Sequence, residues 1–219
     1  MIQASKVLFS QCRLLWLLPL IPFSCLWAEP ATPEATPVPA EQSAPEDPVL
    51  VSFIREGYAE LRGGNPDGAE RAFRAALQIN PNHRDARFGL GTVLITAEKH
   101  GPARDILLKM AEDFPNDYFV LNNLGWLFAT SRDVTVRDGD RAIHFARAAL
   151  VLAPEDFHVW STLSEAYFIA GQYERAARSS QEALRLARLS GLGEAELQNY
   201  RRLAEKCQAA VSAMSILEL

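Results

Sequence analysis

The sequence contains few of the residue combinations that support catalysis or metal binding. Its four histidines are scattered, and none of them pairs with another histidine or with a cysteine at metal-site spacing. It lacks the motifs G-x-S-x-G and H-E-x-x-H, and it has no glycine-rich loop of the kind that holds phosphate groups. We therefore predict a protein that is not an enzyme and that has no catalytic residues, no metal and no cofactor.

Basic charge and cysteine are also scarce. The chain has 22 Lys and Arg residues against 27 Asp and Glu residues, so it lacks the basic excess typical of nucleic-acid-binding proteins. Two of its three cysteines, Cys12 and Cys25, lie near the N-terminus, which leaves Cys207 alone in the remainder. A single cysteine cannot form an intrachain disulfide. We expect Cys207 to be a small apolar residue packed on a helix, with an intermolecular bridge as the alternative.

The N-terminal segment has the features of a secretory signal. Lys6 and Arg13 precede an apolar run over residues 14–27, which is as long as a signal-peptide core and too short to cross a hydrocarbon layer of about 30 Å. We predict that residues 1–28 are a cleaved signal peptide and that the protein is exported, with the bacterial periplasm as its expected location. An uncleaved signal, or a lipid on Cys25, would instead anchor the chain to the membrane.

Residues 29–48 form a stretch rich in proline, alanine and glutamate. It contains six prolines and five acidic residues but no basic residue and no apolar periodicity. Such a stretch cannot bury enough apolar surface to offset the entropy lost on ordering. We predict a disordered linker, extended at about 3.1 Å per residue, that precedes a folded domain over residues 49–219.

Small residues and prolines recur at a fixed interval in this predicted domain. They form three series: glycine or serine (Gly57, Gly91, Gly125 and Ser164), alanine (Ala69, Ala103, Ala142 and Ala176) and proline (Pro81, Pro115 and Pro154). Every interval is 34 residues, except for one interval of 39 residues in each series. Agreement among three independent series indicates a 34-residue structural unit with one five-residue insertion.

A 34-residue helix–turn–helix unit is the period of the tetratricopeptide repeat (TPR) family, and the chain resembles that family over about residues 50–190. The fourth unit follows the family pattern W-x2-L-G-x2-Y…A with Trp160, Leu163, Tyr167 and Ala176, and departs from it at Ser164. The second and third units keep the glycine, the alanine and the final proline. In the first unit, Glu56 and Glu60 interrupt the apolar pattern, which is typical of an outer cap.

The resemblance implies an all-α fold, a right-handed TPR solenoid of four helix–turn–helix repeats plus a C-terminal capping helix. The repeats are expected at about residues 50–83, 84–117, 118–156 and 157–190, and the capping helix at about 194–213. The capping helix should place one apolar side on the solenoid and one polar side in water. The insertion falls in residues 131–139, inside the third repeat, as either a surface loop or a partner contact.

The resemblance also implies a concave groove, lined by the first helix of each repeat, that binds a peptide. The groove residues expected here are Tyr58, Phe88, Thr92, Phe119, Asn122, Asn123, Trp126, Ser161, Glu165 and Phe168. Aromatic rings would supply buried area, and amide side chains would bond to a peptide backbone. The alternative is that several of these side chains are packed between repeats. A clamp for C-terminal carboxylates is not expected, because only Asn123 matches the residues that such clamps use.

These observations predict a non-catalytic scaffold or assembly factor of the cell envelope that binds a peptide segment of another protein. Two alternatives remain open: a self-associating structural component of an envelope complex, or an adaptor anchored to the membrane by an uncleaved signal. The expected partner is a protein, with a second copy of the chain under the first alternative. Nucleic acid is not an expected partner, and membrane contact is expected only with an anchor.

Overall fold

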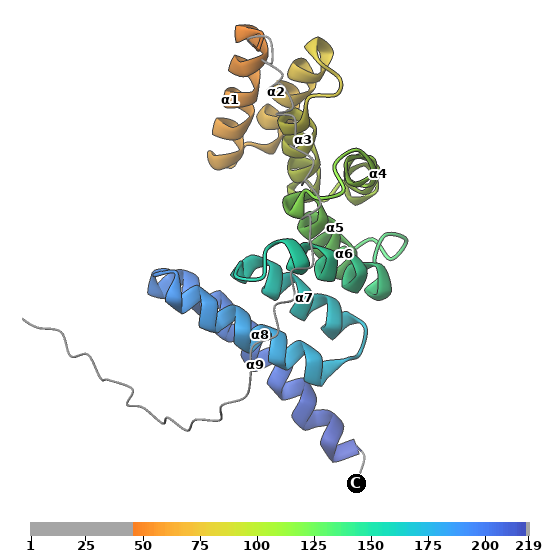
Figure 1. Ribbon diagram of the computed structural model, residues 1–219, viewed down its shortest axis with the longest axis vertical. Helices are drawn as coiled ribbons and strands as arrows, with labels where there is room; N and C mark the ends of the chain where they lie inside the picture. Colours follow the sequence, from red (N-terminus) through yellow and green to blue (C-terminus); the bar gives the residue numbers. More distant parts are fainter. Residues whose placement is uncertain (1–45, 218–219) are drawn as a thin grey trace, which may run out of the picture. The chain divides into compact units, whose positions relative to one another are not determined.

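Nine α-helices make up the part of the chain that the computed structural model describes, residues 46–217 (Figure 1). In chain order they are α1 (Pro48–Arg62), α2 (Pro66–Ile79), α3 (Arg84–Thr96), α4 (His100–Asp113), α5 (Tyr118–Thr130), α6 (Gly139–Leu152), α7 (Phe157–Ile169), α8 (Tyr173–Leu189) and α9 (Glu194–Leu217). No strand occurs between residues 46 and 217. The predicted signal peptide and most of the predicted linker lie outside this range.

The helices form four successive pairs, α1–α2, α3–α4, α5–α6 and α7–α8, and α9 packs against α8 (Figure 1). A continuous core of buried side chains runs from Ala69 and Phe73 in the first pair to Leu163 and Ala166 in the fourth. The prediction of an all-α TPR solenoid is therefore confirmed. The last helix is longer than expected, because it reaches Leu217 rather than about residue 213. No helix within residues 46–217 is both long and apolar enough to cross a membrane.

Local sequence signals set where the helices begin and end. The Asn65 side chain accepts a hydrogen bond from the Gly68 backbone N–H at 3.1 Å, and proline occupies the first position of α2. Asp156 caps α7 in the same way, through the His158 backbone N–H at 2.8 Å. Helices α2, α4 and α6 each end two residues before one of the recurring prolines, because proline cannot continue the hydrogen-bonded ladder.

The recurring glycines allow the helices to approach one another closely. A Cβ atom at Gly57 would lie 2.8 Å from the Phe73 ring, and one at Gly125 would lie 3.1 Å from the backbone nitrogen of Ala146. In the fourth repeat, the buried Ser164 takes the glycine position. Its hydroxyl donates to the backbone carbonyl of Ala176 at 2.9 Å, so the two marker residues of this repeat are hydrogen-bonded to each other.

The turn inside each of three pairs contains a residue with positive φ. Gly64 and Gly171 have φ of 75° and 73°, which glycine adopts without steric cost. Glu98 takes the corresponding place in the second pair with φ of 58°, a conformation that strains a side-chain-bearing residue. The second pair therefore holds a locally unfavourable backbone conformation that its neighbours avoid.

The pairs stack with their first helices on the inner side. Helix α1 contacts α3, α3 contacts α5, and α5 contacts α7, whereas the second helices α2, α4, α6 and α8 make no such contacts with one another within the described residues. A stack in which only the first helices touch one another must curve toward them. Helices α1, α3, α5 and α7 therefore form the concave face, as the resemblance implied.

The five-residue insertion is packed on the solenoid. Its Val136 side chain is only 2% exposed and joins the core, and the Phe128 carbonyl accepts a hydrogen bond from the Asp138 backbone N–H at 2.9 Å. Ser131 is also buried, and its hydroxyl lies 2.9 Å from Nδ1 of His100 in α4. The insertion thus contributes to the core and contacts α4, while its Val134 side chain remains 70% exposed.

Candidate functional site

A cleft of about 520 Å³ opens on the concave face between α5, α7 and α9. Six of the ten predicted groove residues line it: Phe119, Asn122, Asn123, Trp126, Ser161 and Glu165. The other lining residues are Tyr118, Asp156, His158, Thr162, Asn199, Tyr200 and Leu203. The structure thus gathers the predicted residues of the third and fourth repeats into one concavity, which we call the α5–α9 cleft.

Helix α5 supplies the aromatic and amide wall of the α5–α9 cleft. Phe119 and Trp126 are 49% and 39% exposed, which is unusual for rings of this size. The Asn123 amide nitrogen donates to the Thr92 hydroxyl at 3.3 Å, so this amide is engaged within the solenoid. The Asn122 Oδ1 atom is buried and has no hydrogen-bond partner. An unpaired buried carbonyl oxygen costs roughly 1–3 kcal/mol.

Helix α7 provides the polar floor of the cleft. Asp156 caps the start of this helix, and its side chain lines the cleft together with that of Tyr118. Burial, followed by the Asp156 carboxylate, raises the pKa of Tyr118, so the phenol remains neutral at physiological pH. Glu165 lies further along the helix and forms an ion pair with Lys206 at 2.7 Å. The floor therefore carries two carboxylates, of which one is neutralised by α9.

Helix α9 forms the second wall, a role that the sequence interpretation did not anticipate. Asn199, Tyr200 and Leu203 project into the cleft, and the Tyr200 hydroxyl lies 3.1 Å from Nδ1 of His158. Lys206 of α9 forms the ion pair with Glu165 on α7. The prediction that α9 only caps the solenoid is therefore incomplete, because the helix also closes one side of its groove.

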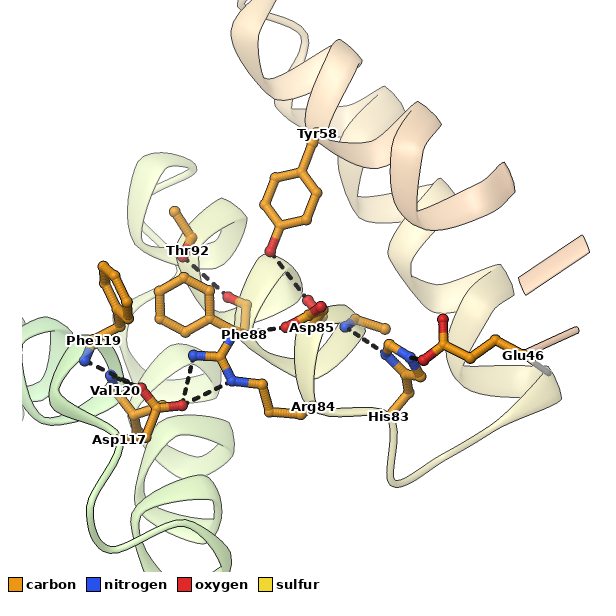
Figure 2. A network of polar contacts seen from close by, with 11 residues as sticks. Glu46, Tyr58, His83, Arg84, Asp85, Phe88, Thr92, Asp117, Phe119 and Val120 are labelled. Atoms are coloured by element: carbon orange, nitrogen blue, oxygen red, sulfur yellow. Dashed lines mark hydrogen bonds and ion pairs between the residues drawn. The ribbon is translucent and has the colours of Figure 1, made fainter. Parts of the chain in front are cut away.

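The predicted residues of the first two repeats lie outside the cleft and contact side chains or backbone of neighbouring repeats (Figure 2). The Tyr58 hydroxyl donates to the Asp85 backbone carbonyl at 3.3 Å, which connects α1 to α3. Phe88 packs edge-on against Phe119, with ring centroids 6.2 Å apart. Thr92 accepts the hydrogen bond from Asn123 described above. These side chains are packed between repeats, which is the alternative that the sequence left open for them.

Arg84 organises this network, although no sequence pattern marked it. Its guanidinium donates to the Asp117 carboxylate through Nε at 2.8 Å and through a terminal nitrogen at 2.6 Å (Figure 2). A second terminal nitrogen donates to Asp85 at 2.6 Å, and the guanidinium carbon lies 5.1 Å from the Phe88 ring centroid. Partial burial opposes the charged form, but the two carboxylates outweigh it and raise the pKa of Arg84. Asp117 also caps α5, so the ion pair connects the starts of α3 and α5.

Phe168 lies beyond the cleft, under α9. Its ring packs edge-on against Tyr173 at a centroid distance of 5.4 Å, and the Lys206 ammonium lies 4.1 Å above its centre. This residue therefore helps to attach α9 and does not line the cleft. Within residues 46–217, no group of three or more His, Cys, Asp or Glu side chains is placed to hold a metal ion.

Comparison with known proteins agrees with this architecture. The family model described as "Tetratricopeptide repeat" matches residues 60–122. A search of curated proteins gives no match. A solved structure of MamA, from residue 41 onward, of Desulfovibrio magneticus RS-1 is 16% identical, with 78% of this chain and 96% of that chain covered and a TM-score of 0.56.

Two further solved structures extend the comparison. TTC0263, a thermophilic TPR protein of Thermus thermophilus, is 18% identical, with 78% of this chain and all of that chain covered (100%) and a TM-score of 0.56. A mutant O-GlcNAc transferase of Thermobaculum terrenum is 23% identical over 64% of this chain, with a TM-score of 0.54, but only 26% of that enzyme is covered. At these identities the similarity shows the fold alone.

Proposed function

This chain is a tetratricopeptide-repeat protein, and from that premise we propose that it is a non-catalytic scaffold that binds a peptide segment of another protein in the α5–α9 cleft. One observation carries the proposal: amide side chains line both walls of a single concave cleft, beside exposed rings on α5 and the half-buried Tyr200 ring on α9. Rings bury apolar area at low entropic cost, and amides bond to the peptide backbone. Asn122 and Asn199 lie on opposite walls, so they would hold an extended backbone from two sides.

Selection of binding peptides from a phage-displayed random library tests this proposal. Selected peptides are then titrated against the wild-type chain and against the Asn122→Ala/Trp126→Ala variant by calorimetry. We expect the variant to bind about 5–150-fold more weakly, because loss of an anchoring ring and an amide at the centre of an interface costs about 1–3 kcal/mol. The far-ultraviolet circular dichroism of the variant should remain that of the wild type, since Trp126 is partly exposed.

A matched control separates the cleft from the rest of the surface. Val134 and Leu189 are 70% and 71% exposed and do not line the cleft. The Val134→Ala/Leu189→Ala variant should bind the selected peptides as tightly as the wild type does. Equal binding by the cleft variant and the wild type would show that the cleft is not the peptide site.

We further propose that the protein acts in the cell envelope. The support comes from the sequence: basic residues precede an apolar run, and a proline-rich stretch follows it. A fusion of residues 1–48 to alkaline phosphatase, which is active only after export, should be active in a bacterial host. Inactivity of this fusion, alongside an active fusion to an established signal peptide, would contradict export.

Self-association is the second candidate function, because α9 ends in exposed apolar residues. Ile216 and Met214 are 71% and 38% exposed on the last turns of this helix, which extends beyond the predicted boundary. Apolar side chains gathered at the end of a solenoid suit contact with another protein surface. Sedimentation of the wild type and of the Met214→Ser/Ile216→Ser variant over a range of concentrations tests this candidate. A dimer that the variant loses would favour self-association.

A further inference from the structure

A second groove lies on the outer side of the solenoid and shares no lining residue with the α5–α9 cleft. Helices α6 and α8 do not contact each other within the described residues. A concavity of about 650 Å³ lies between them, and side chains of α7 form its floor. Its lining includes three arginines and three apolar or aromatic residues: Arg147, Val151, Trp160, Tyr167, Arg175 and Arg178. We call it the α6–α8 groove.

None of the three arginines in the α6–α8 groove is paired with a carboxylate of residues 46–217. Arg147 and Arg178 are exposed, and neither guanidinium has a hydrogen-bond or ion-pair partner in the part of the chain that the structure describes. Arg175 is also exposed, and within that part its guanidinium donates only to the neutral side-chain amide of Gln172, at 2.9 Å. The three charges are therefore available to a ligand.

The acidic side chains near the groove leave its positive charge in place. Glu182 is the one acidic residue in the lining, and its two carboxylate oxygens accept hydrogen bonds from Arg185 at 2.8 and 2.5 Å. Glu174 lies one turn before Arg178, but it is outside the lining and forms no ion pair with Arg178 among the described residues. The lining thus carries three positive charges and one negative charge, although the whole chain has a net charge of -5.

The equivalent groove two repeats earlier, between α2 and α4, is smaller and has a different charge arrangement. Its volume is about 370 Å³, and its lining includes Arg87 and Asp105. Arg87 is already paired with Asp113, at 2.6 Å. One interval of 34 residues and one of 39 residues connect Arg87 to Trp160 and Asp105 to Arg178. The α6–α8 groove therefore has a ring and a cation at these two positions, so its charge does not follow from repeat packing.

Apolar surface lies beside the arginines. Val151 is 82% exposed, and Trp160 and Tyr167 are half-buried in the floor. The Trp160 indole N–H donates to the backbone carbonyl of Pro154 at 2.8 Å, so this ring needs no further polar partner. The Arg175 guanidinium lies 5.8 Å from the centre of the Tyr167 ring. Tryptophan, tyrosine and arginine are the residues most enriched among those that dominate the binding energy of protein interfaces.

We propose that the α6–α8 groove is a second docking site, which binds an acidic segment of a partner protein. The segment carries Asp or Glu residues on both sides of an aromatic or aliphatic residue. Arginine binds a carboxylate through two parallel N–H donors, so the free guanidinium groups select the acidic residues. The apolar residue of the segment covers Val151 and the Trp160 ring, which removes their apolar surface from water.

Charge separates this site from the inner cleft and from nucleic-acid binding. Asp156 and Glu165 line the α5–α9 cleft, and like charges would repel an acidic segment there. A nucleic acid is a poorer occupant of the outer groove, because a chain with a net charge of -5 repels the phosphate backbone outside the groove. The solenoid can therefore hold two different segments at once, one on each side.

Peptide selection on a chain with an altered inner cleft tests the second site. A phage-displayed random library is selected against the full chain that carries Asn122→Ala/Trp126→Ala, and the selected peptides are titrated by calorimetry. We expect an excess of Asp and Glu around an aromatic or aliphatic residue. Binding should weaken as NaCl rises from about 0.05 to about 0.5 M, because salt screens exposed charges.

Variants of the groove locate the binding. Arg147→Ala/Arg178→Ala should bind the selected acidic peptides about 2–30-fold more weakly, since two exposed charge contacts are lost. The Arg71→Ala/Arg188→Ala variant has the same net charge, with exposed arginines replaced outside the groove, and it should bind as the wild type does. Val151→Ser should also weaken binding, because apolar contact area is lost while the charge is kept.

Several results would overturn the second site. Selected peptides without an acidic excess, no selected peptides at all, or equal binding by the arginine variant and the wild type would each show that the groove does not bind an acidic segment. Displacement of the peptides by a single-stranded oligodeoxythymidine would assign the groove to nucleic acid. The two proposals fail separately, because Asn122→Ala/Trp126→Ala weakens only peptides of the inner cleft and Arg147→Ala/Arg178→Ala weakens only peptides of the outer groove.

Discussion

Substitution of Gly89 in α3 offers a direct test of how the first two repeats are joined. The Phe73 ring of α2 is fully buried, and a Cβ atom at Gly89 would lie 2.3 Å from its Cζ atom and 2.4 Å from Cε1. Carbon atoms pack at about 3.5–4.0 Å, so the ring or the helix would have to move by at least 1 Å. The ring has little room to move, because the same ring edge also faces Gly57 and the Tyr58 ring lies 5.0 Å away.

The expected effect of Gly89→Ala is a net loss of stability. Overpacking of a buried site costs about 1–3 kcal/mol, whereas replacement of glycine by alanine inside a helix contributes about 0.8–1 kcal/mol of stability. The difference is a free energy of unfolding lowered by up to about 2 kcal/mol, with about 1 kcal/mol at the middle of these ranges. Because each pair contacts only its neighbours, the loss should appear first in the α1–α2 pair.

Gly101→Ala is the matched control. Gly101 lies in α4, and a Cβ atom there would meet nothing within 4 Å. This variant should stay within about 1 kcal/mol of the wild type, because the gain from replacing glycine is offset by the restriction that Pro102 places on the residue before it. Urea unfolding followed by circular dichroism measures both variants. If Gly89→Ala were as stable as Gly101→Ala, the close approach of α3 to Phe73 would not exist.

A double-mutant cycle identifies the partner of the added methyl group. Phe73→Leu alone should destabilise the chain, because it removes buried ring atoms. In the Gly89→Ala/Phe73→Leu variant, the smaller side chain leaves room for the methyl group, so the two losses should not add. Strict additivity would mean that the methyl group meets some other part of the structure.

Four further predictions follow from single contacts. Arg84→Gln should lower the free energy of unfolding by about 1 kcal/mol, measured by urea unfolding, because it breaks the link between α3 and α5 at a partly exposed site; a variant as stable as the wild type would contradict this. Glu98→Gly should raise the melting temperature, because glycine relieves the positive-φ strain of about 1 kcal/mol or more. The only interaction lost is an exposed ion pair with Arg132. A lower melting temperature would show that the strain is absent. Cys207 should react with a thiol reagent only after unfolding, in a variant whose other two cysteines are replaced by serine. The reason is that Cys207 is fully buried and that burial raises the pKa of its thiol. Fast reaction of the folded variant would contradict this burial. Burial and then nearby carboxylates raise the pKa of three tyrosines, Tyr58, Tyr118 and Tyr200, so their contribution to stability should be present below pH about 10 and lost as the pH rises through the folded-state pKa. Phenolate absorbance should show these three ionising later in the folded chain than in denaturant, and ionisation of the three at the same pH in both would refute it.

Much of the architecture could be predicted because each TPR unit has the same requirements for helix packing and capping. Gly57, Gly91 and Gly125 recur in step because each first helix must approach its partner at the same level. Helix ends could be predicted as well, because capping at Asn65 or Asp156 involves residues only two or three positions apart. The insertion was located correctly by the shift in period, but burial of its Val136 could not be foreseen, since the partners of this side chain belong to other helices.

The candidate site was predicted only in part. Residues of α5 and α7 were expected on one face because they occupy equivalent positions in neighbouring repeats, and the structure brings Asn122, Trp126 and Ser161 into one cleft. Tyr58 and Phe88 occupy equivalent positions as well, but they are packed between repeats. Repeat position specifies the face on which a side chain lies, whereas the neighbouring repeat determines whether a partner can reach it.

The sequence by itself determined the repeat, the helix pairs and their caps, because each depends on spacing along the chain, whereas the concave face was implied by the resemblance to the TPR family. Only the tertiary structure decided that α9 forms a wall of the cleft. The contacts that hold α9 join Tyr200 to His158, Lys206 to Glu165 and Cys207 to Ser164, across 42, 41 and 43 residues. No repeat includes α9, so no period constrains its side chains, and their positions follow from packing against α7 and α8.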